Sequence, residues 1–339
     1  MEKANRRIVF VLPFVDMVSD YVRALCLKDY QPPGWIFTYL KGDYPKVFNF
    51  YPARFFYRFY FYLTRIVRLT HKKQAMVYFI TPQNPFLLWA LRNIFNRIIV
   101  IDIQDGIHSK ELLGYRKSIA IIKNSDYVVF ESLENAAFWK DKINTPFSVV
   151  EDTPQHECVY LDFDKRDKVV IWIGSIHTVK YLSDFISYFK LFSEMGYMVR
   201  LLGCTSELSS FLNKENIAHS YLEHYDSDTL SKELRMARIS FIPMTNTELF
   251  KFRGNLKAKI SMAYGCLTIA SDLDMHKRLI INNKTGYLFN NLSKFEKILS
   301  KLHDLEVNKN IAFSGNKYIT ENFERQRHVA QLISVANRL

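Results

Sequence analysis

The stretch VVIWIGSIHTVKYL, residues 169–182, decides the fold class predicted for this chain. It opens with five apolar residues in a row, which is too short a run for a helix and is typical of a strand covered on both faces. Gly174-Ser175 then ends the run, and a helical pattern opens at Lys180. A strand, a glycine-containing turn and a helix form the repeating unit of a parallel sheet wrapped by helices.

The same unit recurs along the 339 residues. Short apolar runs rich in β-branched residues alternate with helical patterns in both halves, so we predict an α/β protein with two parallel sheets. A polar segment at Glu151–Lys168 separates the halves like a linker. The predicted strands are Ile8–Leu12, Met76–Ile80, Ile98–Ile103, Tyr127–Phe130, Phe147–Val150, Val169–Ile173, Met198–Leu202, Ile239–Ile242, Leu267–Ala270 and Tyr287–Phe289.

This order predicts an N-terminal domain over residues 1–155 and a C-terminal domain over residues 165–318. A last helix is expected near Ile319–Arg338, within a closing segment at 319–339 that could lie across either domain and cross back to the first. In open parallel sheets the ligand binds beyond the carboxyl ends of the strands. The residues that follow each strand are therefore the candidate site residues.

Composition limits the kind of protein and its partners. Hydrophobic residues make up 48% and charged residues 24%, which suffices for two packed cores and excludes disorder as the main state. The net charge is +12, and residues 1–73 carry 13 Lys or Arg against 5 Asp or Glu. A basic first domain favours an anionic partner. No nucleic-acid-binding motif accompanies the charge, so nucleic acid is not the expected partner.

Cysteine usage and hydropathy favour a cytoplasmic protein. The four cysteines lie far apart without a CxxC pair, which argues against a zinc site and against a secreted disulfide framework. Residues 8–15 are apolar but lack a small-residue cleavage site, so no signal peptide is predicted. No stretch reaches the roughly 18 apolar residues that span a bilayer. We expect a soluble protein or one peripheral to a membrane.

Two strand ends in the second half carry candidate anion-binding residues. Gly174 and Ser175 stand at a strand-to-helix turn, where backbone N–H groups can approach a phosphate, although a plain tight turn has the same residues. Four cations fall within Lys251–Lys259, among them Arg253 and Lys257. An Arg fork and a Lys point charge at a helix start can clamp a diphosphate. The alternative is a solvated basic turn.

These residues resemble the donor-binding domain of glycosyltransferase family 4 and its relatives in the GT-B fold. The match is specific in the second domain and covers roughly residues 95–290. It rests on Trp172-Ile173-Gly174-Ser175, Thr178, Tyr181-Leu182, Pro243, Arg253, Lys257, Met262-Ala263-x-Gly265, Ile269-Ala270-Ser271-Asp272 and Thr285-Gly286-Tyr287-Leu288-Phe289, with Asp102-Ile103-Gln104-Asp105-Gly106 and Ser125-Asp126-Tyr127-Val128-Val129 in the first half.

The resemblance implies two Rossmann-like domains that face a central cleft. It also implies transfer of a sugar, with retention, from a UDP- or GDP-linked nucleotide sugar to an acceptor held by the first domain. Arg253 and Lys257 would hold the donor diphosphate, and Gly174 and Ser175 would line its approach. The chain departs from the family at Ile260, where the resemblance implies a glutamate that contacts the nucleotide ribose.

Candidate catalytic groups follow a strand of the first domain. Asp105 and His108 come after the strand that ends at Ile103, although Asp102 and Asp105 could instead cap a helix. His177, close to Gly174, could face the donor or solvent. No DxD triplet occurs, so no metal and no cofactor beyond the donor substrate is expected.

Residues 52–73 (PARFFYRFYFYLTRIVRLTHKK) predict a basic amphipathic helix. At 100° per residue its cations fall within an arc of about 80°, opposite an apolar side. We expect the apolar side to pack on the domain and the cations to face anionic lipid or acceptor phosphates, with aromatic insertion or solvated arginines as alternatives. The cations are Arg54, Arg58, Arg65, Arg68 and Lys72, and the apolar residues are Phe55, Phe56, Phe59, Leu63, Ile66 and Val67.

The leading functional hypothesis is a glycosyltransferase that assembles a bacterial surface polysaccharide, such as lipopolysaccharide, capsule or exopolysaccharide. Its partners would be a nucleotide sugar, a glycan or lipid-linked acceptor, and the inner face of the cell membrane. Ile260 motivates an alternative, a catalytically silent GT-B scaffold protein. A third hypothesis is another enzyme of this fold, such as a nucleotide-sugar epimerase or a polyol-phosphate transferase.

Overall fold

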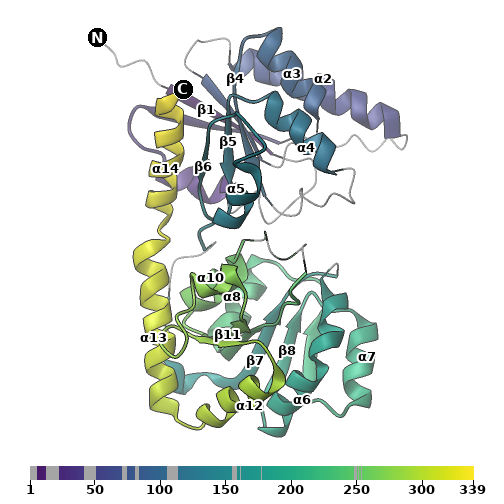
Figure 1. Ribbon diagram of the computed structural model, residues 1–339, viewed down its shortest axis with the longest axis vertical. Coiled ribbons are helices and arrows are strands. Elements are labelled where there is room, and N and C mark those ends of the chain that lie inside the picture. The colour runs from purple at the N-terminus through teal and green to yellow at the C-terminus, as the bar shows by residue number, and fades with distance from the viewer. Residues whose placement is uncertain are drawn as a thin grey trace. The chain divides into compact units, whose positions relative to one another are not determined.

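The computed structural model divides the chain into two compact units, each described by itself below (Figure 1). The first unit comprises Met1–Gln155, Phe252–Gly254 and Arg325–Leu339, and the second comprises His156–Lys251 and Asn255–Glu324. The structure describes residues 6–12, 23–41, 51–70, 75–80, 84–104, 114–154, 159–160, 162–176, 178–247, 250, 252 and 254–339.

The first unit is a parallel six-stranded sheet in the order β2-β1-β3-β4-β5-β6. Its strands alternate side chains between two cores: Val9 and Val11 face one, and Ile8 and Phe10 face the other. The strands are β1 Arg6–Val11, β2 Trp35–Leu40, β3 Ala75–Ile80, β4 Ile98–Ile103, β5 Tyr127–Phe130 and β6 Phe147–Val149. The helices are η1 Leu25–Tyr30, α2 Tyr51–Leu69, α3 Pro85–Asn93, α4 Gly114–Lys123, α5 Leu133–Trp139 and α14 Arg325–Arg338.

The second unit is also a parallel six-stranded sheet, in the order β12-β11-β10-β7-β8-β9. The strands are β7 Asp167–Ile173, β8 Met198–Leu202, β9 His219–Leu222, β10 Ala237–Ile242, β11 Leu267–Ser271 and β12 Tyr287–Phe289. The helices are η2 Phe163–Lys165, η3 Val179–Phe185, α6 Ile186–Glu194, α7 Ser206–Lys214, α8 Ser227–Met236, α10 Leu256–Ala263, α11 Asp274–Lys277, α12 Leu292–Lys301 and α13 Leu305–Asn322.

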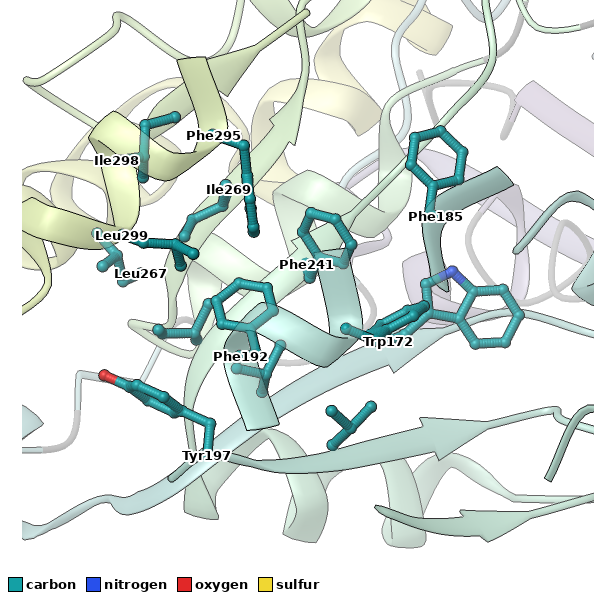
Figure 2. Close-up of a cluster of buried hydrophobic side chains, with 14 of the residues drawn as sticks. Trp172, Phe185, Phe192, Tyr197, Phe241, Leu267, Ile269, Phe295, Ile298 and Leu299 are labelled. Carbon is teal, nitrogen blue, oxygen red and sulfur yellow. The ribbon is translucent and has the colours of Figure 1, made fainter. Parts of the chain in front are cut away.

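An aromatic core fills one face of the second sheet (Figure 2). The Phe241 ring on β10 lies 5.3 Å from Phe192, 5.4 Å from Phe289 and 5.5 Å from Phe295, centroid to centroid. Trp172 on β7 belongs to the same cluster. Large buried aromatic rings of this kind supply much of the hydrophobic stabilisation of a core. Through Trp172, this core holds the end of β7 that leads to the candidate site.

The predicted fold class, an α/β protein with two Rossmann-like sheets, is confirmed. All ten predicted strands are present, with ends that differ by at most two residues. The sequence analysis missed β2 and β9, which are both edge strands. All four residues of β9 (HSYL) are only half-buried, and its first two residues are polar, so it lacks the continuous apolar run of a central strand. Strand β2 (WIFTYL) buries only two of its six side chains, although five of them are apolar.

The single helix expected near Ile319–Arg338 is instead two helices. Helix α13 ends at Asn322, where the N–H of Phe323 bonds the carbonyl of Ile319, and α14 begins at Arg325. Helix α14 belongs to the first unit, where Val329, Leu332 and Val335 join the core on the side of η1. The unbroken helical pattern of the sequence conceals this break.

The order of the strands identifies where each sheet reverses its winding. Read from β9, the second sheet has the order 3-2-1-4-5-6 of a doubly wound nucleotide-binding fold, and the reversal falls between β7 and β10. The first sheet has the order 2-1-3-4-5-6, so its reversal falls between β1 and β3. Ligands of such sheets bind where the connections diverge. In the second unit that point lies after Ile173 and Ile242.

Candidate functional site

The turn after β7 is built around Gly174. A Cβ atom at this position would lie 1.9 Å from Cη2 of Trp172, because the indole ring folds back over the glycine. Trp172 is buried in the aromatic core, so the ring has little room to yield. Only glycine therefore fits here while the tryptophan keeps this position.

Two residues that the sequence analysis missed hold the Gly174 carbonyl in place. Gly203 follows β8 with φ of +78°, and a Cβ atom on it would lie 2.4 Å from the Gly174 oxygen. Tyr225 donates its hydroxyl to the same oxygen at 2.9 Å, and burial raises the pKa of Tyr225 to about 12, which keeps the hydroxyl protonated. Gly203 directly follows a predicted strand, which was a signal for the first contact, whereas nothing local in the sequence signals the second.

Hydrogen bonds to β8 and within the turn occupy the backbone N–H groups of Gly174 and Ser175. The Gly174 N–H bonds the carbonyl of Leu202 at 2.9 Å, and the Ser175 N–H bonds the hydroxyl of Thr178 at 3.0 Å. The Thr178 hydroxyl in turn donates to the Ser175 carbonyl at 3.1 Å. The side chain of Ser175 is exposed. A phosphate at this turn would therefore meet the hydroxyl of Ser175 rather than these two amides.

Lys257 lies in the first turn of α10. The helix begins at Leu256, and the buried side chain of Asn255 just before it donates to the carbonyl of Met275 at 3.0 Å. Nζ of Lys257 lies 5.4 Å from the centroid of the Trp172 ring. A cation over an indole face is attracted by the ring. The tryptophan that covers Gly174 thus also contacts Lys257, which brings two of the predicted site residues to one place in the second unit.

His276 is a buried titratable group beside Lys257, and the sequence analysis missed it. Its Nδ1–H donates to the carbonyl of Ser271 at 2.7 Å, at the end of β11. The pKa of His276 is lowered to about 4, mainly by burial and in smaller part by the positive charge of Lys257. The imidazole is therefore neutral near pH 7, so Lys257 is the charged member of this pair.

Several predicted site residues lie outside the described part of the chain. These are Asp105, His108, His177, Arg253 and Lys72. Of the predicted donor-binding residues, Gly174, Ser175 and Lys257 lie within the described part.

The first unit contains a buried ion-pair network at Asp102. Arg23 donates from Nε to Asp102 at 2.8 Å, and the Tyr78 hydroxyl bonds the same carboxylate oxygen at 2.5 Å. Arg23 also pairs with Asp152 at 3.0 Å. All three of Arg23, Asp102 and Tyr78 are fully buried. The Asp102 carboxylate thus ties β4 to other elements of the unit, which differs from the helix-cap role that the sequence left open.

Helix α2 matches the predicted amphipathic helix and ends at Leu69. Arg65 and Arg68 are exposed, whereas Arg54 and Arg58 are half-buried. Ile66 is fully buried, and Phe59, Leu63 and Val67 pack against the core. The assignment of Phe56 to the packed side is wrong, because this ring is 67% exposed. Within the described residues no helix is long and apolar enough to cross a membrane, and no cluster of His, Cys, Asp and Glu could hold a metal ion.

Comparison with solved structures identifies the fold. HepE of Anabaena, solved with UDP and glucose, superposes with a TM-score of 0.74 at 10% identity over 98% of this chain and all (100%) of its own. Sucrose-phosphate synthase from Thermosynechococcus elongatus has a TM-score of 0.72 at 14% identity, covering 98% of this chain and 99% of its own. The fold is GT-B.

TarM is a third similar structure, with a TM-score of 0.66 at 12% identity over 82% of this chain. This chain spans only 58% of the length of TarM. No protein-family model matches the sequence. No curated protein matches it either. The likeness therefore concerns the three-dimensional fold.

Within this GT-B fold, Ile260 is a core residue. Its side chain, on α10, is 6% exposed and packs in a hydrophobic cluster with Ile171 and Leu230. The resemblance to glycosyltransferase family 4 implies a glutamate here that contacts ribose. A buried isoleucine makes no hydrogen bond, so this position contributes packing rather than a polar contact.

Proposed function

We propose that this protein is a glycosyltransferase that moves a sugar from a nucleotide-sugar donor, UDP- or GDP-linked, to a glycan or lipid-linked acceptor. The reaction proceeds with retention at the transferred sugar. Its product belongs to a bacterial surface polysaccharide, and the enzyme works in the cytoplasm at the inner face of the cell membrane.

The observation that carries the proposal is Lys257 at the start of α10, beside the point where the second sheet reverses its winding. This is where a sheet of the order 3-2-1-4-5-6 binds a nucleotide. Structures of the same fold support the choice of ligand: HepE was solved with UDP-glucose, and the TarM of S. aureus was solved with UDP and α-GlcNAc-glycerol.

Each residue at this edge has a proposed part in holding the donor. Lys257 neutralises the diphosphate as a point charge, and Arg253 adds a bidentate contact. Ser175 is exposed in the tight turn that contains Gly174, and its hydroxyl donates a hydrogen bond to a phosphate oxygen. Stabilising the leaving diphosphate is the main requirement of a retaining transfer. Asp105 and His108 are proposed as the polar catalytic groups of the first unit.

Lys257→Met tests the donor site. Loss of one charge-assisted contact to a diphosphate costs about 1.5–3 kcal/mol, which is roughly a tenfold to hundredfold loss of affinity. We expect UDP or GDP to raise the melting temperature of the wild-type protein and to do so far less in the variant. Lys297→Met, which removes an exposed lysine on α12, is the matched control and should keep wild-type affinity. Equal affinity in both variants would contradict the assignment.

Ile260 supports a second candidate, a GT-B scaffold that binds without catalysis. A buried isoleucine replaces the ribose contact that the resemblance implies. Hydrolysis and transfer measured over a panel of UDP- and GDP-sugars separate the two candidates. Turnover of any donor, lost in Lys257→Met, supports the enzyme. Nucleotide binding without turnover of any donor, with and without acceptor glycans, supports the scaffold.

A further inference from the structure

The indole ring of Trp172 reaches past the end of its own strand. Its side chain points into the aromatic core (Figure 2), whereas Ile171 and Ile173 point to the opposite face of the second sheet. The ring leans along the strand, because a Cβ atom on Gly174 would lie within 2.2 Å of both Cη2 and Cζ2 of the indole. The ring thus extends from one face of the sheet to the carboxyl end of β7.

Lys257 reaches the same place from the other face of the sheet. Leu256, which precedes it on α10, packs against the cluster that contains Ile171. Helix α10 therefore covers the face opposite to the aromatic core. Nζ of Lys257 nevertheless lies 5.4 Å from the centroid of the Trp172 ring. An indole from one face and an ammonium group from the other thus meet beyond the end of β7.

This meeting point lies where the second sheet reverses its winding. The chain that leaves β7 continues in η3, whose Val179 and Leu182 belong to the aromatic core. The connection from β10 leads to α10 on the opposite face. Neighbouring strands whose connections diverge in this way leave an opening for a ligand at their carboxyl ends. Trp172 and Lys257 contact each other at that point.

Two separate contacts hold the backbone and the tip of Lys257. The side chain of Asn255 donates to the Met275 carbonyl at 3.0 Å, which fastens the start of α10 to the turn after β11. The indole ring attracts the ammonium group at the other end of the side chain. A long lysine side chain loses rotamer freedom when it binds a ligand, and it loses less if its tip is already held. The ammonium group has three N–H donors, so one side can face the ring while another meets a phosphate.

We propose that Trp172 is a positioning residue of the donor site, whose indole face holds the ammonium group of Lys257 where the donor diphosphate binds. The inference rests on the proposed function and deepens it, because it explains how the lysine is placed. Gly174 belongs to the same arrangement, since a side chain at this position would displace the ring. Trp172 acts through Lys257 and leaves the contact with the phosphate to the lysine.

Fluorinated tryptophans, inserted at position 172 alone, test the proposal with little change of shape. Fluorine atoms withdraw electrons from the ring and weaken its electrostatic attraction for a cation. The affinity for UDP, measured by isothermal titration calorimetry, should fall with each added fluorine, by about twofold to thirtyfold over the whole series. The same series in Lys257→Met should leave the affinity for UDP unchanged, because the cation that the ring attracts has been removed.

Ordinary substitutions separate the role of the ring from core packing. Trp172→Leu removes the aromatic face and should weaken UDP binding severalfold, whereas Trp172→Phe keeps such a face and should retain most of the affinity. Phe192→Leu is the matched control, because Phe192 is a fully buried ring of the same core. It should lower the free energy of unfolding and leave the affinity for UDP unchanged.

His276 provides a readout that needs no nucleotide. Burial above all, and the charge of Lys257 in smaller part, lower its pKa. A lysine released from the ring extends into solvent, so Trp172→Leu should raise the pKa of His276, measured by nuclear magnetic resonance titration. In Lys257→Met the same substitution should cause no further rise. This titration gives an answer even if the protein binds no UDP.

Two results in a protein that binds UDP would overturn the proposal. One is an affinity for UDP that stays constant along the fluorinated series. The other is an equal loss of affinity in Trp172→Leu and Phe192→Leu, which would leave the ring a role in packing only. A wild-type protein that binds no UDP would contradict the donor site of the proposed function instead. The His276 titration then decides: a rise in Trp172→Leu supports the placement of Lys257 by the ring, and an unchanged pKa rejects it.

Discussion

The two sheets of this protein share six parallel strands but differ in their order and in what their glycines contact. The second sheet reverses between β7 and β10, and the first between β1 and β3. Gly34 precedes β2 of the first sheet with φ of +82° and has nothing within 4 Å of a Cβ position. Gly203 follows β8 of the second with φ of +78°, pressed against the Gly174 backbone. The same backbone conformation is thus a plain turn in one unit and part of a tightly packed candidate site in the other.

Gly203→Ala and Gly34→Ala test this difference and should give the largest effect. Both place a side chain at positive φ, which costs about 1–2 kcal/mol. In Gly203→Ala the new methyl group also meets the Gly174 carbonyl, so a further 1–3 kcal/mol, roughly, is lost to overpacking. We expect Gly203→Ala to lower the free energy of unfolding clearly more than Gly34→Ala, measured by urea denaturation. Equal losses would show that the two turns are packed alike.

Acid should destabilise the second unit through His276. Its pKa is near 6.5 unfolded and about 4 folded, so between these values the unfolded chain binds a proton that the folded chain does not. Stability therefore falls as pH drops from about 6.5 to 4, by up to about 3 kcal/mol. Urea denaturation across this range should show a smaller acid loss in His276→Gln than in wild type. His303→Gln, at an exposed position, should keep the wild-type loss, and an unchanged slope in His276→Gln would refute the burial argument.

A smaller effect links His276 to Lys257. Because the Lys257 charge helps to lower the pKa of His276, Lys257→Met should raise that pKa. Nuclear magnetic resonance titration of the histidine ring measures the change. Lys297→Met should leave the titration of His276 where it is in wild type. A shift of equal size in both variants would mean that Lys257 has no particular proximity to the imidazole.

The sequence predicts the central strands well because a strand covered on both faces is apolar along its whole length. It misses two of the four edge strands, Trp35–Leu40 and His219–Leu222, whose side chains are mostly half-buried. The break between α13 and α14 is hidden for a different reason. Residues near Phe323 continue the helical pattern of the sequence. The break becomes visible only in the fold, where Ile319 packs in one hydrophobic core and Val329 packs in another.

The candidate site is predicted only where a local pattern signals it. Gly174 and Lys257 stand out because one breaks a strand and the other opens a helix. Tyr225 and His276 act through contacts with distant positions, the carbonyls of Gly174 and Ser271, and those contacts depend on the fold. The outward side of α2 is missed for a similar reason. Periodicity identifies an apolar side, but the neighbouring elements decide which rings are covered.

Hydrogen–deuterium exchange with and without UDP tests the central claim, that a nucleoside diphosphate binds where the second sheet reverses its winding. The account predicts slower exchange with UDP in peptides that cover residues 174–179 and 256–263, and loss of this protection in Lys257→Met at the same UDP concentration. Protection confined to residues before 150, or protection at 256–263 that is the same in Lys257→Met, would contradict it.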